Sequence, residues 1–376
     1  MANKDRLTQN EIDRYSRHLI LPEVGLKGQL KLKNSKVLVV GTGALGSPVL
    51  LYLSAAGVGA IGIIDFDTLD LSNLQRQVIH KTAEIGNKKV NSAKSRINEI
   101  NPNINVITYD DKLTSKNALE IIKNFDIVVD GTDNFPTRYL INDACVFLNK
   151  PFVYGAIFRF EGQTTVFNAN KNAPCYRCIF KDPPKAGLVP SCSEAGVLGV
   201  LPGIIGTIQA SETIKTILEI GETLKGRLLT LNASKMEFKE YKIKKDENCA
   251  VCGKNPTIKE LIDYEEFCGL KNQKDDYRVE DISIYELKEL MGNKENIDIF
   301  DIREDVKDSE IIEGFKTIKL SEILLDISIL NNNRKIILLC TIGLKSKEAI
   351  KKIKKAGYMG EIYSLKGGIT SFINDL

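Results

Sequence analysis

A glycine-rich loop, GTGALG at Gly41–Gly46, constrains the fold of this chain more than any other feature of its sequence. The loop follows a continuous apolar run, KVLVV at Lys36–Val40, which is typical of a parallel strand buried on both faces. An apolar helix is predicted directly after the loop, over Ser47–Gly57. Glycines let a backbone approach an anion, and the N-terminus of the following helix directs free N–H groups toward that anion. The pattern therefore predicts a βαβ unit with a phosphate-binding turn.

Strands and helices continue to alternate after this loop, as they do in doubly wound α/β proteins. The strands expected after residue 150 have a different pattern, which predicts that the sheet continues in mixed form. The expected elements of this first part are a helix over 10–33, strands at Ala60–Asp65, Asn105–Tyr109, Asp126–Asp130, Phe152–Ala156, Gln163–Asn168, Leu228–Asn232 and Glu237–Ile243, and helices near 87–100, 115–124 and 206–220. We therefore predict an α/β fold with a doubly wound, Rossmann-like, mostly parallel sheet.

A second, smaller α/β pattern follows a polar, turn-rich stretch. The 376 residues suggest two or three domains, at roughly 100–200 residues each. The second pattern has strands at Ile297–Asp301 and Lys335–Cys340 and helices near 321–330 and 346–356. We predict a first domain over residues 1–253, a linker over 254–277 and a second domain over 278–376.

Composition argues against several classes of partner and location. Lys and Arg total 52 against 49 Asp and Glu, so a net charge of +3 gives no electrostatic drive toward nucleic acid or anionic membranes. The polar N-terminus lacks the apolar core of a signal peptide. The longest uncharged run, Ala195–Ser211, is broken by glycines and a proline and is shorter than the ~20 residues that span a bilayer. We expect a cytoplasmic protein with no membrane segment and no direct nucleic-acid contact.

An acidic residue ends the second predicted strand. Asp65 lies 19 residues after Gly46, where a carboxylate can accept hydrogen bonds from ribose hydroxyls. The loop and this carboxylate together indicate a nucleotide or a dinucleotide and nothing finer. They leave open an NAD-dependent oxidoreductase, an enzyme that uses a nucleoside triphosphate, and a scaffold that binds nucleotide without catalysis.

A group of polar and cationic residues favours the triphosphate. Asn73, Arg76 and Lys89 follow the strand that ends at Asp65. Fixed cations stabilise the charge that develops on phosphate oxygens during transfer, whereas a dehydrogenase has little use for them there. Asp133 lies in DGTDN at the end of another strand, where open α/β sheets bind ligands, and could hold Mg²⁺. Taken singly, each of these residues could equally be a solvated charge or a helix cap, and Ser72 would cap well.

Four sequence elements together resemble the MoeB/ThiF family of ubiquitin-activating-type adenylyltransferases. They are GTGALG, DFDTLDLSNLQRQ, DGTDN with Pro136, Thr137 and Arg138, and EGQTTVF, and the resemblance covers residues 10 to about 253. It implies a homodimer with a doubly wound sheet. It also implies that ATP activates the C-terminal Gly-Gly carboxylate of a small ubiquitin-like sulfur carrier, of the MoaD/ThiS type, as an acyl-adenylate with release of pyrophosphate.

The resemblance also implies roles for individual residues. Asp65 would bind ribose, Asp133 would bind Mg²⁺, and Arg17 in DRYSRH resembles the arginine that the family lends to the neighbouring subunit's ATP. Ala44 departs from members that have another glycine there, but its methyl group is small and its N–H remains. The full set of expected nucleotide-binding residues is Gly41, Gly43, Ala44, Gly46, Asp65, Ser72, Asn73, Arg76, Lys89, Asp133 and Asn134, of which Arg76 and Lys89, with Arg17, are also expected to act in catalysis.

Two CxxC pairs lie a whole module apart, at Cys175 and Cys178 and at Cys249 and Cys252. Four thiolates with this spacing suit tetrahedral Zn²⁺, and Gly253 fits a turn after the second pair. Two independent redox motifs, or a coincidence, are the alternatives. The resembling family has a structural zinc at these positions, which would leave no open coordination site for catalysis.

Cys192, in LVPSCSEAGVLG, is expected to lie in a loop. A thiol near an acyl-adenylate could capture the acyl group as a thioester or an acyl disulfide, and the resembling family has a cysteine here whose necessity varies. A structural loop cysteine is an equally good interpretation.

Cys340 ends a predicted strand and opens the loop CTIGLK before a helix. Such a loop aims N–H groups at the sulfur, which should lower its pKa and stabilise a persulfide. With DIRE and SLKGGITSF, residues 278–376 resemble a rhodanese sulfurtransferase domain. A cysteine phosphatase needs CxxxxxR, and residue 346 is Ser. Lys345 is the only cation of the loop, so a protein persulfide, such as that of a cysteine desulfurase, is favoured over thiosulfate as the donor; an inactive docking domain is the alternative.

The combination of the two parts predicts one reaction sequence. The first part would make a carbonyl electrophilic, and the second would deliver sulfur to it, giving a thiocarboxylate on the carrier. Activation of a small-molecule or tRNA carboxylate is a related possibility. The carrier's pathway stays open among molybdopterin synthesis, thiamine synthesis, tRNA thiolation and cysteine synthesis.

Overall fold

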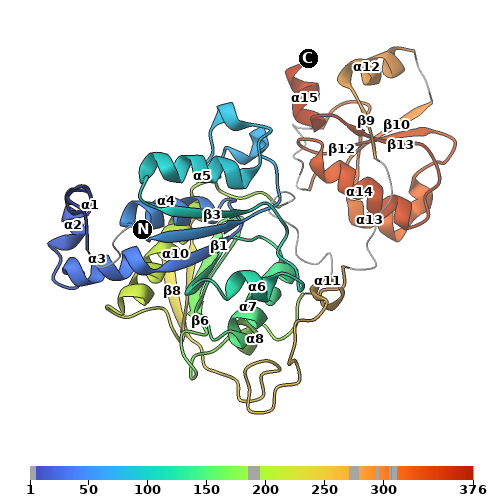
Figure 1. The fold of residues 1–376 in the computed structure, drawn as a ribbon. Coiled ribbons are helices and arrows are strands. Elements are labelled where there is room, and N and C mark those ends of the chain that lie inside the picture. Colours follow the sequence, from blue (N-terminus) through green and yellow to red (C-terminus); the bar gives the residue numbers. More distant parts are fainter. Residues whose placement is uncertain are drawn as a thin grey trace. The chain divides into compact units, whose positions relative to one another are not determined.

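The computed structural model describes residues 6–184, 195–270, 279–293, 296–304, 306 and 311–375. The chain divides into two compact units, Met1–Lys271 and Asn272–Leu376, and each is described by itself (Figure 1). In the described parts of the chain, no helix is long and apolar enough to cross a membrane.

The first unit is built on an eight-stranded mixed sheet with the order β3-β2-β1-β4-β5-β6-β7-β8. The five strands from β3 to β5 are parallel and the last three are antiparallel to their neighbours. The strands are β1 (Lys36–Val40), β2 (Ala60–Ile64), β3 (Asn105–Tyr109), β4 (Ile127–Asp130), β5 (Phe152–Phe158), β6 (Glu161–Phe167), β7 (Arg227–Asn232) and β8 (Glu237–Lys242). The predicted fold class, a doubly wound, mostly parallel sheet, is confirmed.

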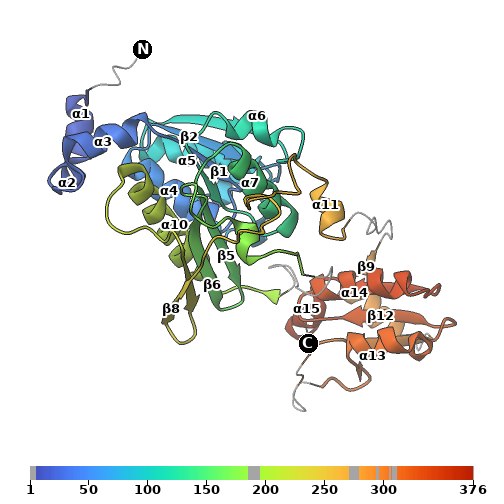
Figure 2. The same cartoon turned by 90° about the horizontal axis from the view of Figure 1, so that it is seen from below.

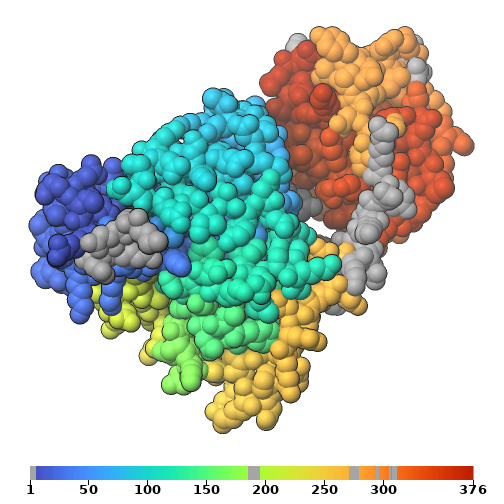
Figure 3. All heavy atoms as spheres, viewed as in Figure 1, coloured from blue at the N-terminus to red at the C-terminus, as the bar shows by residue number. Residues whose placement is uncertain are grey.

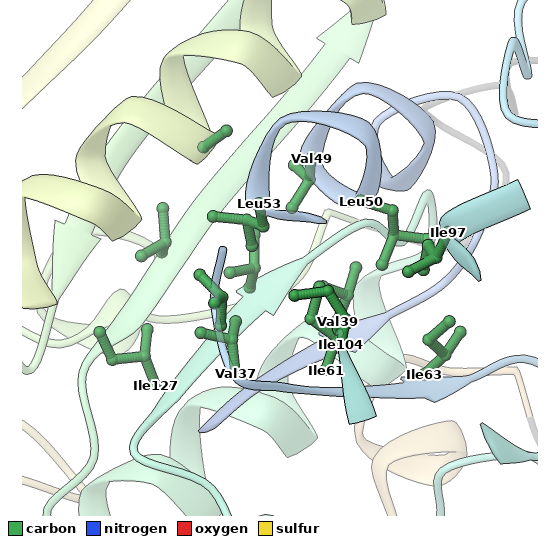
Figure 4. Packing of buried hydrophobic residues seen from close by; sticks show 14 of the residues in the cluster. Val37, Val39, Val49, Leu50, Leu53, Ile61, Ile63, Ile97, Ile104 and Ile127 are labelled. Atoms are coloured by element: carbon green, nitrogen blue, oxygen red, sulfur yellow. The ribbon is translucent and has the colours of Figure 1, made fainter. Parts of the chain in front are cut away.

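Helices cover both faces of this sheet, because the central strands are apolar on both sides. One core packs α4, α5 and α10 against Val37, Val39 and Ile61, and Figure 4 shows Val49, Leu50 and Leu53 of α4 over these strands. The other core packs α6 and α7 on the opposite face (Figure 2). The helices are α1 (Gln9–Arg14), α2 (Ser16–Leu19), α3 (Gly25–Asn34), α4 (Gly46–Ala56), α5 (Lys89–Ile100), α6 (Ala118–Ile122), α7 (Phe135–Phe147), α8 (Tyr176–Ile179), α10 (Leu201–Leu218) and α11 (Tyr264–Phe267).

The second unit holds a five-stranded parallel sheet with the order β11-β10-β12-β13-β9. Its central strand β12 is buried along Ile336–Leu339 and leads into Cys340. One core lies under α13 and α14, and the other lies under α12 and α15. The elements are β9 (Glu280–Ile282), α12 (Ile284–Gly292), β10 (Ile297–Asp301), β11 (Lys316–Thr317), α13 (Leu320–Leu325), β12 (Lys335–Leu339), α14 (Leu344–Lys355), β13 (Ile362–Leu365) and α15 (Gly368–Asn374).

Residues 254–270, which the sequence placed in a linker, pack on the first unit, and we call them the C-terminal strap. Tyr264 of the strap is 4 % exposed, and its hydroxyl donates a 2.8 Å hydrogen bond to Asp143 Oδ2 on α7. Cys268 joins the same core. In Figure 3 the golden surface, near residues 240–265, lies against the green surface, which belongs to earlier residues of the first unit. The first unit therefore extends to Lys271. Composition did not indicate this packing, because the few apolar side chains of the strap stand singly among polar residues.

The expected helix over 10–33 is three helices instead. A capping box between Thr8 and Glu11 starts α1, and the chain bends again before Gly25, whose φ is +52°. Strand β9 and helix α12 fall in a stretch with no predicted element; α12 is fixed by a capping box between Ser283 and Glu286.

A chain that ends at residue 253 should be less stable than one that ends at residue 271. The shorter chain loses Tyr264, Phe267 and Cys268 from the core, which corresponds to roughly 3–5 kcal/mol of unfolding free energy. Urea unfolding of the two truncated chains, followed by circular dichroism, measures the difference. Equal midpoints would show that the strap contributes nothing to the first unit.

Candidate functional site

The glycine loop Gly41–Gly46 lies where the strand order reverses, between β1 and β4. Val40 at the end of β1 pairs with both Ile64 and Asp130, so three strands end at the same level. In open α/β sheets, ligands bind outside the carboxyl ends of strands at such a point. The structure therefore brings the loops after β1, β2 and β4 to one edge of the sheet.

At two positions of the loop, Gly41 and Gly46, neighbouring backbone atoms leave no room for a side chain. Gly41 has a φ of +90°, and a Cβ there would lie 2.8 Å from the carbonyl oxygen of Gly131. A Cβ on Gly46 would lie 2.0 Å from the carbonyl oxygen of Gly41. Gly43 is different, because a Cβ there would meet only Gln77 Nε2, at 3.7 Å. Its missing side chain leaves space beside the loop, as expected where a ligand approaches the backbone.

Helix α4 begins at Gly46, at the end of this loop. The N–H and the hydroxyl of Ser47 both donate to the carbonyl oxygen of Gly43, at 3.0 and 2.7 Å, so this carbonyl is occupied by the helix. The N-terminus of α4, without a side-chain cap, provides the partial positive charge expected for a phosphate site.

Asp65 follows β2 and fixes the loop from the side. Its Oδ2 accepts hydrogen bonds from the Thr42 N–H and hydroxyl, both at 2.8 Å, and its Oδ1 accepts one from the Asp67 N–H at 2.9 Å. A carboxylate oxygen has a second lone pair, so these bonds leave acceptor capacity for a ribose hydroxyl.

Lys89 opens α5 and turns back toward β2. Its side chain is buried, and Nζ forms a 2.6 Å ion pair with Asp67 Oδ2. Sequence reasoning did not identify Asp67, which holds this lysine beside Asp65. The only signal was its position two residues after Asp65, on a segment already assigned to the site.

Asn73 and Arg76 lie on a turn that is capped by Asp70, not by Ser72 as the sequence suggested. Asp70 caps the short 3-10 helix Leu71–Asn73 by accepting the Ser72 N–H at 2.8 Å, so Ser72 is not the cap. Arg76 Nη1 donates to the Ser72 carbonyl oxygen at 3.1 Å. With Pro48 of α4, Arg76 lines a pocket of about 470 Å³, which places this cation beside the start of α4.

Asp133 and Asn134 follow β4 at the same edge. Asp133 is exposed. Asn134 caps α7 by accepting a 3.0 Å hydrogen bond from the Thr137 N–H, so its side chain has a structural role at the start of this helix. Asp130, which sequence reasoning did not identify, is buried and bonds Arg138 Nε at 3.0 Å. Burial opposes the charge of Arg138, but Asp130 raises the pKa of its guanidinium above the usual value.

His80 lies beneath the glycine loop and was also missed. Its Nε2 is 3.1 Å from the Thr42 carbonyl oxygen and its Nδ1 is 2.8 Å from Ser92 Oγ. Burial lowers the pKa of His80, and Nε2, when it carries a proton, donates to the Thr42 carbonyl oxygen. Arg17 lies apart from this group on α2, where it is exposed, and its expected role across a dimer stays a prediction.

The four paired cysteines meet in one cluster at the far end of α7. Their sulfur atoms all lie within 4.8 Å of one another, with Cys175–Cys249 at 3.6 Å and Cys178–Cys252 at 3.4 Å. Zn–S bonds of about 2.3 Å place tetrahedral sulfurs about 3.8 Å apart. These separations fit a metal ion and are far longer than a disulfide bond, so the four thiols fit a Zn²⁺ site.

The first CxxC turn is fixed by a buried ion pair. Arg177, between Cys175 and Cys178, donates two hydrogen bonds to Asp143, at 2.8 and 2.9 Å. Asp143 also accepts the hydroxyl of Tyr264, and the Arg177 guanidinium lies 4.5 Å from the ring centre of Phe267. One buried carboxylate thus links the cysteine cluster to the C-terminal strap.

The second unit carries Cys340 in a loop at the end of β12, and we call Cys340–Gly343 the sulfur loop. The thiol is buried, and Sγ accepts the Ser346 N–H at 3.4 Å from the first turn of α14. In the first turn of α15, the N–H groups of Ile369 and Thr370 donate hydrogen bonds to the carbonyl oxygens of Cys340 and Thr341, respectively. The carbonyl oxygens of Cys340 and Thr341 are thus bound to α15, while the start of α14 directs the Ser346 N–H at the sulfur. This arrangement suits a persulfide.

Three further cysteines, Cys145, Cys268 and Cys192, lie outside the cluster and the sulfur loop. Cys145 on α7 is fully buried in the hydrophobic core. Burial raises the pKa of Cys268 to about 11. Cys192 lies outside the described residues.

Gly46→Ala and Gly43→Ala should separate folding from ligand binding. The first puts a Cβ 2.0 Å from a backbone oxygen and should lower the unfolding free energy by about 3 kcal/mol or more. The second meets only the far end of Gln77 and should leave the melting temperature nearly unchanged while weakening ATP binding. Calorimetry on both variants tests this; unaltered ATP affinity in Gly43→Ala would show that the ligand does not approach the loop there.

Comparisons with known proteins agree with this geometry. Residues 15–251 match the ThiF family and residues 283–375 match the rhodanese-like domain. The probable adenylyltransferase/sulfurtransferase MoeZ of Mycobacterium tuberculosis is 43% identical over 98% of this chain and 95% of its own. The sulfur carrier protein adenylyltransferase of Thermus thermophilus is 50% identical over 71% of this chain and all of its own, and the MOCS3 adenylyltransferase and sulfurtransferase of Culex quinquefasciatus is 47% identical over 79% and 69%.

Among solved structures, E. coli MccB crystallised with ATP shares a TM-score of 0.57 at 23% identity, covering 67% of this chain and 77% of its own. That likeness concerns the fold alone. The family matches and the 43% identical relative show that this chain belongs to the ThiF family and carries a C-terminal rhodanese-like domain.

Proposed function

We propose that this chain uses ATP to adenylylate the C-terminal glycine carboxylate of a small ubiquitin-like sulfur carrier protein, and that Cys340 then supplies the sulfur of a thiocarboxylate. The main support is the presence of both parts in one chain, matched over 98% of its length by a relative named as an adenylyltransferase and sulfurtransferase. The arrangement of Gly43, Arg76 and Lys89 at the switch point supports ATP as the first substrate.

The adenylylation step follows from charge. The carrier's carboxylate attacks the α-phosphorus of ATP, pyrophosphate leaves, and no general base is needed because the nucleophile is already ionised. Both reactants are anions, so cations must offset their repulsion before they meet. Arg76 and Lys89 would hold the phosphates, with Asn73 and Ser72 beside them, and Asp65 would hold the ribose. Mg²⁺, when held by Asp133, supplies further charge neutralisation at the phosphates.

Sulfur transfer would follow on the same carrier. A persulfide on Cys340 attacks the acyl-adenylate carbonyl and AMP leaves, which gives an acyl disulfide. A thiolate, for which Cys192 is our candidate, would then attack the Cys340 sulfur of that S–S bond, so that the thiocarboxylate leaves and a Cys192–Cys340 disulfide forms. An external dithiol reductant must reduce this disulfide before the next turnover. The persulfide donor is proposed to be a protein, such as a cysteine desulfurase. Arg17 is proposed to complete the ATP site of a partner subunit in a homodimer.

The experiment for adenylylation is ATP–pyrophosphate exchange by the full chain with small proteins that end in Gly-Gly. Exchange should require the free terminal carboxylate and should disappear with an amidated C-terminus. Arg76→Ala should reduce exchange about 100-fold or more while leaving the melting temperature near wild type, since this side chain is half-buried at the surface. Exchange that is indifferent to the carrier would refute the proposed substrate.

Cys340→Ala should separate the two halves of the reaction. The variant should keep wild-type exchange, because Cys340 belongs to the second unit, but should form no thiocarboxylate from a persulfide donor. Mass spectrometry of the carrier measures the product. Thiocarboxylate formation at the wild-type rate would show that Cys340 does not carry the sulfur.

The cysteine cluster is proposed to hold one structural Zn²⁺ per chain. Cys249→Ser should lower the zinc content and the melting temperature together, since the ion joins segments 74 residues apart. Cys145→Ala, which removes a thiol outside the cluster, should keep the zinc. Metal analysis of both purified variants measures this; full zinc in Cys249→Ser would rule out the four-thiolate site.

A further inference from the structure

His80 is held under the glycine loop by a line of polar contacts. The residue is 7 % exposed, Nε2 lies 3.1 Å from the Thr42 carbonyl oxygen, and Nδ1 lies 2.8 Å from Ser92 Oγ. Ser92 Oγ in turn donates a 2.5 Å hydrogen bond to Glu84 Oε2. The line therefore joins the glycine loop, through α5, to the short 3-10 helix Thr82–Glu84.

These three contacts need three protons. A carbonyl oxygen only accepts hydrogen bonds, so the contact with Thr42 needs a proton on Nε2. Ser92 gives its single hydroxyl proton to the Glu84 carboxylate, so its oxygen needs a proton from Nδ1. A neutral ring has one N–H and leaves one of the contacts without a proton, whereas a protonated ring fills all of them. The geometry thus fits an imidazolium ring that is linked through Ser92 to Glu84.

The groups around His80 act on its charge in opposite directions. Burial lowers the pKa of His80, the Thr42 carbonyl raises it, Lys89 lowers it, and Asp65 and Glu84 raise it. The net result is a pKa below the usual value of histidine. Without a ligand, the ring therefore takes up its proton only at a pH below that of an exposed histidine, although its contacts are complete only with that proton.

A triphosphate at the glycine loop would change this balance. In the proposed site Lys89 holds phosphates, whose negative charge offsets the repulsion between this lysine and an imidazolium ring. A negative charge nearby favours the charged form of histidine. The ring is also connected to the expected ribose site, because the N–H and hydroxyl of Thr42 both donate to Asp65 at 2.8 Å.

We propose that His80, Ser92 and Glu84 form a proton site linked to the nucleotide site, in which the ring binds one proton from solvent when ATP binds. The new proton lies on Nδ1, Nε2 keeps its proton toward Thr42, and the Ser92 hydroxyl keeps its bond to Glu84. The proton returns to solvent when pyrophosphate leaves, because most of the negative charge leaves with it. His80 is thus a positioning residue that acts through Thr42 and through its own charge.

This inference rests on the proposed binding of ATP at the glycine loop and adds a pH dependence to it. Because a proton is bound together with ATP, the affinity for ATP falls as the pH rises. The fall occurs between the pKa of His80 without ATP and its higher pKa with ATP. The γ-phosphate of ATP also titrates in this region, so the effect of the ring is measured against a variant that cannot bind the proton.

Nuclear magnetic resonance of the full chain reads the ring directly. The chain has two histidines, His18 and His80, so histidine labelling gives two ring signals, and His18→Gln assigns them. The signal of His80 is titrated with pH in the presence and absence of Mg²⁺ and a non-hydrolysable ATP analogue. Its midpoint should lie about one pH unit higher with the analogue, which is about a tenfold change in proton affinity.

Calorimetry of analogue binding gives the reciprocal measurement. Across the two midpoints, the affinity of the wild-type chain should fall about tenfold more than that of His80→Gln. The glutamine of this variant keeps an N–H for the Thr42 carbonyl and binds no proton. Thermal melts check its fold, and the titration of the wild-type ring needs no substitution at His80.

Glu84→Gln tests whether the ring acts with its partners. This variant removes the negative charge and keeps an acceptor oxygen for the Ser92 hydroxyl. The midpoint of His80 should fall by about half a pH unit, with and without the analogue. Glu84 is half-buried at the surface, so the substitution should leave the melting temperature near wild type.

The outcomes distinguish the linkage from the proposed function. If the analogue does not bind the full chain, the proposed ATP site fails. If it binds and leaves the midpoint of His80 where it was, the ATP site stands and the proton linkage is overturned. An unchanged midpoint in Glu84→Gln would also overturn the proposal, because the ring would then titrate independently of Ser92 and Glu84.

Discussion

The backbones of Gly41 and Gly131 approach so closely that neither residue can carry a side chain, and the geometry of the candidate nucleotide site depends on this contact. A Cβ on Gly131 would lie 2.5 Å from the Gly41 carbonyl oxygen, just as a Cβ on Gly41 would meet Gly131. The contact brings the end of β4 against the end of β1. As a result Asp133, on one loop, and the free space at Gly43, on the other, lie at the same edge of the sheet.

A second constraint lies away from the nucleotide and involves a buried carboxylate. Asp143 accepts hydrogen bonds from Arg177 and Tyr264, which come from the cysteine cluster and from the strap. Removal of one partner from a buried ion pair is strongly destabilising, because it leaves an uncompensated charge. We infer that the cluster and the strap support each other through this residue, so that metal content and the integrity of the C-terminal strap should vary together.

The sequence predicted the parts of the molecule whose signals are local. The glycine loop, the apolar run of β1 and the two CxxC pairs each consist of residues close together in the chain, so their spacing was enough to indicate their geometry. Asp67, Asp130 and His80 were missed because each owes its role to a partner 8 to 38 residues away, which spacing does not reveal. Ser72 looked like a cap, but Asp70 holds that position. The packing of Tyr264 and Phe267 on the first unit could not be predicted, because they stand alone in a polar segment, where no periodicity marks them as buried.

The C-terminal strap has a consequence for how such proteins can be assembled from parts. Among the described residues, every member of the two main hydrophobic clusters of the first unit lies before residue 270. The Thermus thermophilus relative, aligned over its whole length with 71% of this chain, is about the size of that unit alone. A sulfur-handling domain could therefore be gained or lost during evolution by a joint placed beyond the strap, without rebuilding the enzyme upstream of it.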